Sequence, residues 1–189
     1  MTEIQRDLFG NAVKPESDHL AIELDLIDGQ SFEPRLKRFR YLDKLREPDT
    51  CQYECSDIGM VTAEMSLLFK EAGLAFVNGA FIATILLCQS FIEHWLADYI
   101  SQKRKLTKKS ENKLNKMLEV CREEGLLHIY LVRKIDDIRL KRNPFTHQKP
   151  YDHPHSVYQR SFKRKIDVED LLEQDAKNAI EIMYTILEA

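Results

Sequence analysis

The stretch "NGAFIATILLCQSFIEHWLADYIS", residues 78–101, decides the fold of this chain. Its apolar residues cover nearly every side of the predicted helix: Phe81, Ile82, Ile85, Leu86, Phe91, Ile92, Trp95, Leu96 and Tyr99. A helix that is apolar all round lies in the middle of a bundle or in an oligomer interface. Its longest apolar run, residues 80–88, is too short to span a bilayer. We therefore expect a buried core helix and no membrane contact.

Four further helices are predicted around this segment. One precedes it, over residues 57–73, with apolar residues at three- and four-residue steps and a stop at Gly73. One follows it, from an N-cap at Ser110 to a C-terminal Gly125, and the next begins directly after that glycine. The last opens at Asp167. About five helices with short connections predict an all-α, mostly up-and-down helical bundle.

The N-terminal part of the chain differs from the rest. Residues 1–32 hold seven acidic residues against two basic ones, and residues 19–29 alternate loosely enough for a short strand. Residues 33–56 predict a short helix or an irregular connection. We therefore expect an acidic N-terminal segment over residues 1–56, irregular or partly extended, and a helical bundle over residues 57–189.

Positive charge is concentrated in the second half of the chain. Residues 100–165 hold eighteen Lys and Arg residues against seven Asp and Glu residues. Within them, residues 148–166 lack periodicity and are predicted to form a loop. Tyr151, Tyr158 and Phe162 alternate there with basic residues, a composition that can grip a single nucleic-acid strand by phosphate contacts and stacking. A solvated basic loop is the alternative.

Metal and disulfide chemistry find little support in the sequence. Cys51 and Cys55 lack a second pair at metal spacing, and His153 and His155 lack a third ligand nearby. There is no Gly-rich phosphate loop and no nucleophile elbow. The first ten residues lack the pattern of a signal peptide. We therefore expect a cytoplasmic protein without a metal site.

The stretch "KRNPFTH", residues 141–147, ends the fourth predicted helix. Its apolar stripe runs through Leu131, Ile135 and Ile138, and the next position on that face is Arg142. A guanidinium at a core position must be paired, unless it reaches water or caps the last carbonyls of the helix. Asn143-Pro144 predicts a break and a new helical turn. Without the break, Arg142 and His147 would point about 140° apart. With the break, both side chains can face the same site.

An arginine and a histidine in one place suit phosphate chemistry. The arginine offers a planar, permanently charged fork for phosphate oxygens, and the histidine titrates near neutral pH and can move protons. RNA carries its own nucleophile in the 2′-OH. Cleavage needs both a base and an acid, so one histidine per chain suggests that two copies of the chain share a cleft.

The sequence "RNPFTH" resembles the R-x4-H motif, in its R-N-x3-H form, of the HEPN superfamily of small helical bundles. The resemblance covers residues 57–189: a long apolar helix with an embedded Glu93, two helices, the motif and a last helix. Many members are metal-independent endoribonucleases of bacterial toxin–antitoxin and anti-phage systems, need no cofactor, and dimerise so that two motifs form a composite site. Other members have lost activity and bind nucleic acids or nucleotides.

The resemblance implies a role for each motif residue. Arg142 would hold the scissile phosphate, His147 would transfer protons, and Asn143 would position the motif or a phosphate oxygen. Glu93 would orient the arginine or the histidine, although an exposed or helix-pairing acid is an equally open interpretation. The basic residues expected to contact RNA are Arg139, Lys141, Arg160, Lys163, Arg164 and Lys165. The partners implied are RNA, a second copy of the chain, and an antitoxin or defence protein.

A second resemblance lies near the N-terminus. "QRDLF" is similar to the short motif by which bacterial proteins dock on the replication sliding clamp, with Gln5, Leu8 and Phe9 as the contacts. A disordered acidic tail is the alternative.

Overall fold

The computed structural model describes residues 32–45, 62–104 and 113–187. The chain divides into two compact units, Met1–Lys37 and Arg38–Ala189. The described residues of the first unit are helical.

Several predictions concern residues outside the described ranges. These are the strand over residues 19–29, the clamp-like motif at Gln5–Phe9, the pair Cys51 and Cys55, the N-cap at Ser110, and the boundary between residues 56 and 57.

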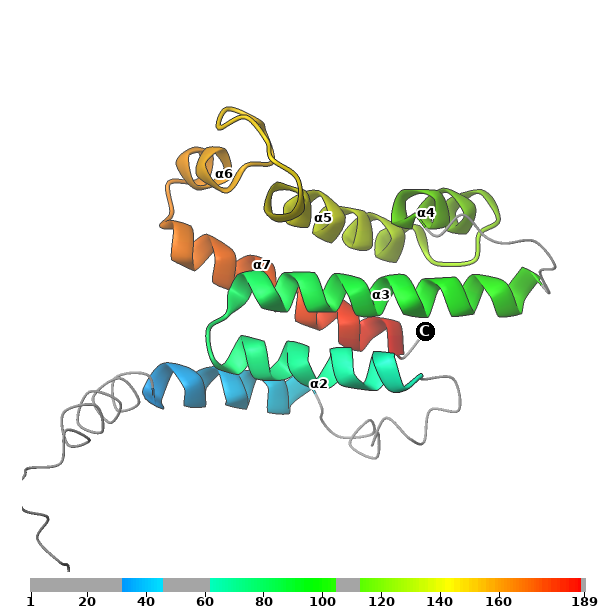
Figure 1. The fold of residues 1–189 in the computed structure, drawn as a ribbon, viewed down its shortest axis with the longest axis horizontal. Coiled ribbons are helices and arrows are strands. Elements are labelled where there is room, and N and C mark those ends of the chain that lie inside the picture. Colours follow the sequence, from blue (N-terminus) through cyan, green and yellow to red (C-terminus); the bar gives the residue numbers. More distant parts are fainter. Residues whose placement is uncertain (1–31, 46–61, 105–112, 188–189) are drawn as a thin grey trace, which may run out of the picture. The chain divides into compact units, whose positions relative to one another are not determined.

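Every regular element in the described ranges is an α-helix, which confirms the predicted all-α bundle (Figure 1). The helices are residues 32–45, α2 (Ala63–Val77), α3 (Phe81–Arg104), α4 (Leu114–Glu123), α5 (Ile129–Thr146), α6 (Val157–Arg164) and α7 (Val168–Leu187). These ranges thus hold seven helices, against the five or so predicted.

The prediction of a loop over residues 148–166 is wrong at α6. Eight residues are too few for a recognisable apolar stripe in the sequence, and the helix is stabilised by capping at both ends. At the start, the Ser156 hydroxyl accepts a hydrogen bond from the backbone N–H of Gln159 at 3.2 Å. At the end, Lys165 adopts a left-handed conformation with φ of 55°, and its N–H bonds back to the Phe162 carbonyl.

Helix α3 is the central helix of the Arg38–Ala189 unit, as its all-round apolar pattern predicts. It packs against α2, α4, α5 and α7, and Figure 1 shows it lying between α2 on one side and α4 and α5 on the other. The buried apolar side chains of α3 cover about half of its circumference at about 100° per residue. They are Phe81, Ile85, Cys88, Phe91, Ile92, Trp95, Leu96 and Ile100. Burial of this surface is the main stabilising contribution that the sequence makes to the fold.

The helices α2, α3, α5 and α7 alternate in direction along the chain, so the bundle is of the up-and-down type (Figure 1). Thr62 caps α2, because its hydroxyl accepts a bond from the N–H of Met65. The predicted stop at Gly73 is wrong: α2 continues past it, and the chain turns at Gly79, where φ is 77°. A glycine at that φ avoids the steric penalty of a Cβ.

The helical residues that follow Lys37 pack on α2. Leu42 is buried in the core, and a Cβ on Gly73 would lie 3.7 Å from its side chain. Arg38 donates a hydrogen bond to the Val77 carbonyl at 2.9 Å. Gly73 therefore serves close helix packing instead of ending a helix.

The turn between α4 and α5 agrees with the sequence. Gly125 follows Glu124, the C-cap residue of α4, with φ of 62°, the left-handed position predicted for it. This turn folds α5 back along α3.

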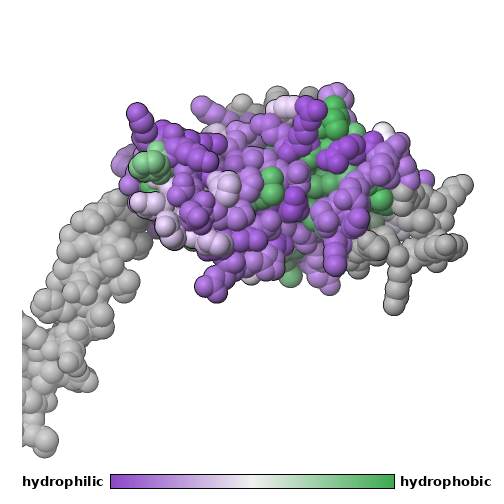
Figure 2. Space-filling view, turned by 90° about the horizontal axis from the view of Figure 1, so that it is seen from above, coloured by the Kyte–Doolittle hydropathy of each residue, from purple (hydrophilic) through white to green (hydrophobic). Residues whose placement is uncertain are grey.

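The face of the molecule in Figure 2 is mainly hydrophilic, with separate hydrophobic spots on it. Within the described ranges, none of the helices has the length and apolar character needed to cross a membrane.

Candidate functional site

Helix α5 does not break at Asn143-Pro144. It runs on to Thr146, and the N–H of His147 bonds to the Asn143 carbonyl at 2.9 Å. Proline removes one backbone donor, but only one turn follows it, and Phe145 in that turn packs against the hydrophobic core. The predicted break and new helical turn are therefore wrong.

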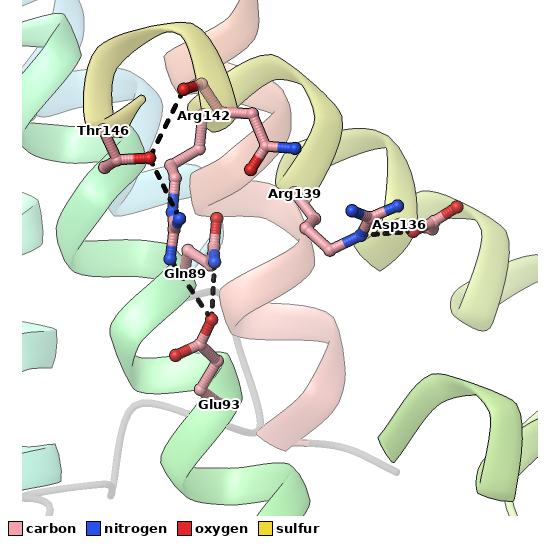
Figure 3. A network of polar contacts seen from close by, with 7 residues as sticks. Gln89, Glu93, Asp136, Arg139, Arg142 and Thr146 are labelled. Carbon is pink, nitrogen blue, oxygen red and sulfur yellow. Dashed lines mark hydrogen bonds and ion pairs between the residues drawn. The ribbon is translucent and has the colours of Figure 1, made fainter. Parts of the chain in front are cut away.

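Arg142 lies at the end of α5 in a polar network with α3 (Figure 3). Its Nη1 donates to Thr146 Oγ1 at 3.0 Å, and its Nη2 lies 3.6 Å from Oε1 of Glu93. The same Glu93 oxygen accepts a bond from Nε2 of Gln89, whose side chain is buried. The guanidinium is thus fixed in orientation while the Arg142 side chain remains 23% exposed.

His147 lies just beyond the helix, as the C-cap residue of α5, and its side chain is exposed. Because α5 is continuous up to this point, the backbone positions of His147 and Arg142 lie about 140° apart around the helix axis. Among the described residues, the hydrogen bonds and ion pairs of the Arg142 side chain go to Thr146 and Glu93 and not to His147. Asn143 is half-buried between them, and its carbonyl accepts bonds from the His147 N–H and the Thr146 hydroxyl.

A cluster of buried charged side chains lies where the C-terminal end of α5 meets α6 and α7. Asp175 on α7 pairs with Lys141 on α5 at 3.1 Å and with Arg160 on α6 at 2.5 Å. All three side chains are buried, and Lys141 also reaches the more exposed Asp137 at 2.7 Å. Lys141 and Arg160, both predicted to contact RNA, are thus turned inward, where they neutralise a carboxylate. Such a cluster ties α5, α6 and α7 together at one point.

The stripe of α5 therefore ends in a different cation from the one predicted. The buried residues are Leu131, Val132, Ile135, Ile138 and then Lys141, whereas Arg142 is partly exposed. Positions three and four residues beyond Ile138 both follow on the same face, so spacing alone cannot choose between them.

The remaining basic candidates are at the surface. Arg139 on α5 is partly exposed and forms an ion pair with Asp136 at 2.7 Å, away from Arg142 (Figure 3). Lys163, Arg164 and Lys165 are exposed at the end of α6. Only these four of the six predicted RNA-contacting cations are open to solvent.

Other chemistries find no support among the described residues. No group of three His, Cys, Asp or Glu side chains in these ranges is arranged to hold a metal ion. His153 Nδ1 accepts a bond from the N–H of His155, which is a local turn contact. Burial raises the pKa of the Cys88 thiol, so this cysteine offers no thiolate nucleophile.

One hollow of about 470 Å³ lies at the N-terminal ends of α3 and α7, lined by residues 79–83, residues 167–169 and Leu172. Its lining on α3 is about 15 Å along the helix from Glu93, at about 1.5 Å per residue. The hollow is thus separate from the Arg142 network.

Sequence reasoning missed Gln89, Thr146 and Asp175. The signal for two of them was present. Gln89 and Glu93 are four residues apart and therefore lie on the same side of α3, and Asp175 interrupts the apolar face of α7 between Leu171 and Ala179. A polar residue on a core face needs a partner from another element.

These contacts define the candidate site as the end of α5, with Glu93 on α3 beside it and the Asp175 cluster behind it. Comparison of the chain with protein-family models, with curated proteins and with solved structures gave no match.

Proposed function

We propose that this chain is a metal-independent endoribonuclease of the HEPN type that acts as a homodimer. The observation that carries the proposal is the contact between Glu93 and Arg142. It joins the motif arginine to the acid of the long helix, the pair that the resemblance assigns to one site. Glu93 and Thr146 hold the guanidinium from two sides. A guanidinium fixed in this way can stabilise developing charge without reorganising first.

The proposed reaction uses the 2′-OH of RNA as nucleophile. His147 removes the 2′-OH proton, the oxygen attacks the adjacent phosphorus, and Arg142 stabilises the negative charge that accumulates on the phosphoryl oxygens. The bond from phosphorus to the 5′ oxygen breaks, and a second imidazole protonates that oxygen. The products are a 2′,3′-cyclic phosphate and a 5′-OH.

A second copy of the chain supplies the second imidazole. Arg142 and His147 of one chain diverge, so one chain cannot place both on one phosphate with the helix as it stands. A two-fold axis near the end of α5 would bring the histidine of each copy toward the arginine of the other. The exposure of His147 leaves it accessible to such a partner.

RNA cleavage with end-group analysis tests the proposal. Purified protein is incubated with 5′-labelled RNA in the presence of a chelator, and the 3′ ends of the fragments are identified. We expect cyclic phosphate ends, and a loss of at least about 100-fold in rate for His147→Ala, since general acid–base catalysis contributes about that much or more. Arg142→Ala should lose activity too.

Matched variants and a blocked substrate complete the experiment. Arg133→Ala changes an exposed arginine on the same helix, and His155→Ala changes a histidine outside the motif; both should cleave as well as the unchanged protein. A 2′-deoxy substitution at the cleavage position should stop the reaction. Equal cleavage by correctly folded His147→Ala or Arg142→Ala protein would refute the catalytic assignment, and full activity of a strictly monomeric variant would refute the composite site.

A non-catalytic nucleic-acid-binding module with the same fold is the second candidate function. The separation of Arg142 and His147 around the axis of α5 within one chain favours it. In that case RNA stays intact with or without chelator, yet binds with an affinity that falls steeply as salt rises.

The resemblance also suggests a setting. We propose that the nuclease is a cytoplasmic component of a bacterial toxin–antitoxin or anti-phage system, held in check by a partner protein. Growth arrest on expression, absent with His147→Ala, would support this. A sliding-clamp contact through Gln5, Leu8 and Phe9 is tested separately, by deleting residues 1–10 and measuring clamp binding.

A further inference from the structure

Helix α6 presents an exposed aromatic and basic face. Tyr158 and Phe162 are four residues apart, so they lie on the same side of the helix, and they are 62% and 72% exposed. Lys163 and Lys165 follow at its C-terminal end and are exposed as well. Large exposed aromatic rings on a short surface helix are costly to leave in water and commonly mark a binding surface.

The buried charge cluster fixes the orientation of this face. Arg160 is two residues from both Tyr158 and Phe162, on the opposite side of α6, and it is anchored to Asp175. Lys141, the neighbour of Arg142, pairs with the same carboxylate. The cluster therefore turns the aromatic face outward and holds α6 beside the end of α5.

The turn before α6 adds a third ring. Tyr151 is the most exposed large side chain of the three, and the Ser156 hydroxyl donates a hydrogen bond to its carbonyl at 2.9 Å. Ser156 also caps α6, so one side chain joins this turn to the start of the helix.

We propose that α6 is a platform for single-stranded RNA, with Tyr158 and Phe162 stacking on bases and Lys163 and Lys165 contacting the phosphates. This deepens the proposed function by naming the substrate class, and it rests on that function for the choice of RNA. The two rings are about 6 Å apart along the helix, at about 1.5 Å per residue. Each can therefore take one base of a strand extended beyond the stacked spacing of about 3.4 Å.

Charge and shape favour a single strand over other occupants. A duplex hides the faces of its bases, so stacking on exposed rings requires an unpaired strand. A membrane-surface helix buries a continuous apolar stripe, whereas the exposed face of α6 offers only the two rings on a helix of eight residues. The acidic first turn of α7, with Glu169 and Asp170, repels phosphate and directs the strand away from α7.

Binding of fluorescent RNA tests the platform. The His147→Ala protein serves as background so that the probe is not consumed. The probe is a labelled 12-nucleotide RNA, used single-stranded or annealed to its complement, and anisotropy gives the affinity. Tyr158→Ala with Phe162→Ala should weaken single-strand binding at least about 30-fold, from two stacking contacts. Tyr130→Ala removes an equally exposed tyrosine from α5 and should leave binding unchanged.

The lysines have a separate signature. Lys163→Ala with Lys165→Ala should lower the dependence of log affinity on log salt by about 1.4, since each phosphate contact on a single strand contributes about 0.7. The aromatic variant should weaken binding without changing this salt slope.

Several results would overturn the platform, three of them in the RNA-binding and light-scattering experiments. They are unchanged affinity in the double aromatic variant, equally tight binding of duplex RNA, and conversion of the aromatic variant to a monomer by light scattering, which would make the face a dimer contact. Uptake by anionic vesicles through the same residues, with RNA binding unaffected, would assign the face to membranes. The readouts keep the two proposals apart. If the aromatic variant loses RNA binding but the protein with His147 unchanged cleaves no RNA, the nuclease proposal alone is refuted. If that protein cleaves RNA and the α6 substitutions leave its cleavage rate unchanged, the platform alone is refuted.

Discussion

Replacing Asp175 with asparagine tests the buried charge cluster by leaving two cations without their shared anion. The Asp175 side chain is 1% exposed and those of Lys141 and Arg160 are 9% exposed. Removing one partner of a buried ion pair costs about 3–5 kcal/mol, because an uncompensated charge stays in the interior. Arg160 loses its carboxylate, and its Nε and Nη2 already lack hydrogen-bond partners among the described residues. Lys141 keeps Asp137 at 2.7 Å, which limits the loss.

We therefore expect Asp175→Asn to lower the free energy of unfolding by about 4 kcal/mol, and Tm by about 8–16 °C for a chain of this length. Urea and thermal unfolding followed by far-ultraviolet circular dichroism measure both. Asp137→Asn is the matched control: this acid pairs with the same lysine but its side chain is 54% exposed, so the loss should stay below about 1 kcal/mol.

A combined variant separates charge from volume. Replacing Lys141, Arg160 and Asp175 together with methionine, methionine and leucine removes all three charges, and a buried triad replaced by apolar residues is often neutral or stabilising. This protein should therefore recover most of the loss. If Asp175→Asn is no less stable than Asp137→Asn, the reasoning from buried charge is refuted.

Three further changes have definite expected outcomes. Pro144→Ala should raise the free energy of unfolding by about 1 kcal/mol in urea titrations, since it restores a backbone donor to the last turn of α5; a loss of stability would contradict this. Burial, and then the hydrogen bond to Glu181, raise the pKa of Tyr41. The stability that the raised pKa gives is present below the ordinary tyrosine pKa of about 10 and is lost as pH rises through the folded pKa. The free energy of unfolding of Tyr41→Phe in urea should therefore fall less steeply at alkaline pH than that of the unchanged protein. An unchanged slope would count against this reasoning. Gly125→Ala should cost about 1 kcal/mol by thermal unfolding, because φ there is 62° while no atom of the described residues lies within 4 Å of an added Cβ; a neutral result would show that the turn can relax.

The sequence predicted those features that belong to one helix or one turn. The all-round apolar surface of α3 requires a central place, and the left-handed turn at Gly125 requires a glycine. Prediction from the sequence was wrong where a local signal for the end of a helix was outweighed by tertiary packing. A glycine inside a helix costs about 1 kcal/mol, whereas burying one large apolar side chain contributes about 1.5–3 kcal/mol. Continuing α2 past Gly73 buries Phe76, and continuing α5 past Pro144 packs Phe145 against the core.

The candidate site was predictable only in part for a similar reason. The spacing of the α5 stripe locates a cation at its end, and the resemblance points to Glu93 as a neighbour of the motif. Which cation is buried depends on Asp175 and Arg160, which lie on other helices and distant in sequence. No spacing rule within α5 carries that information. The continuity of the helix at Pro144, which sets the directions of Arg142 and His147, is likewise decided by tertiary packing.

The packing of α3 against α7 has a consequence for biosynthesis. Helix α3 is translated well before α7, which is the last described helix to emerge. Before α7 is synthesised, the nascent chain therefore exposes the side of α3 that α7 covers in the folded protein. The hydrophobic core is complete only when α7 has packed on α3. During that interval the chain exposes the kind of surface that chaperones bind and that promotes aggregation. Ribosome stalling or premature termination before α7 should consequently yield an insoluble product.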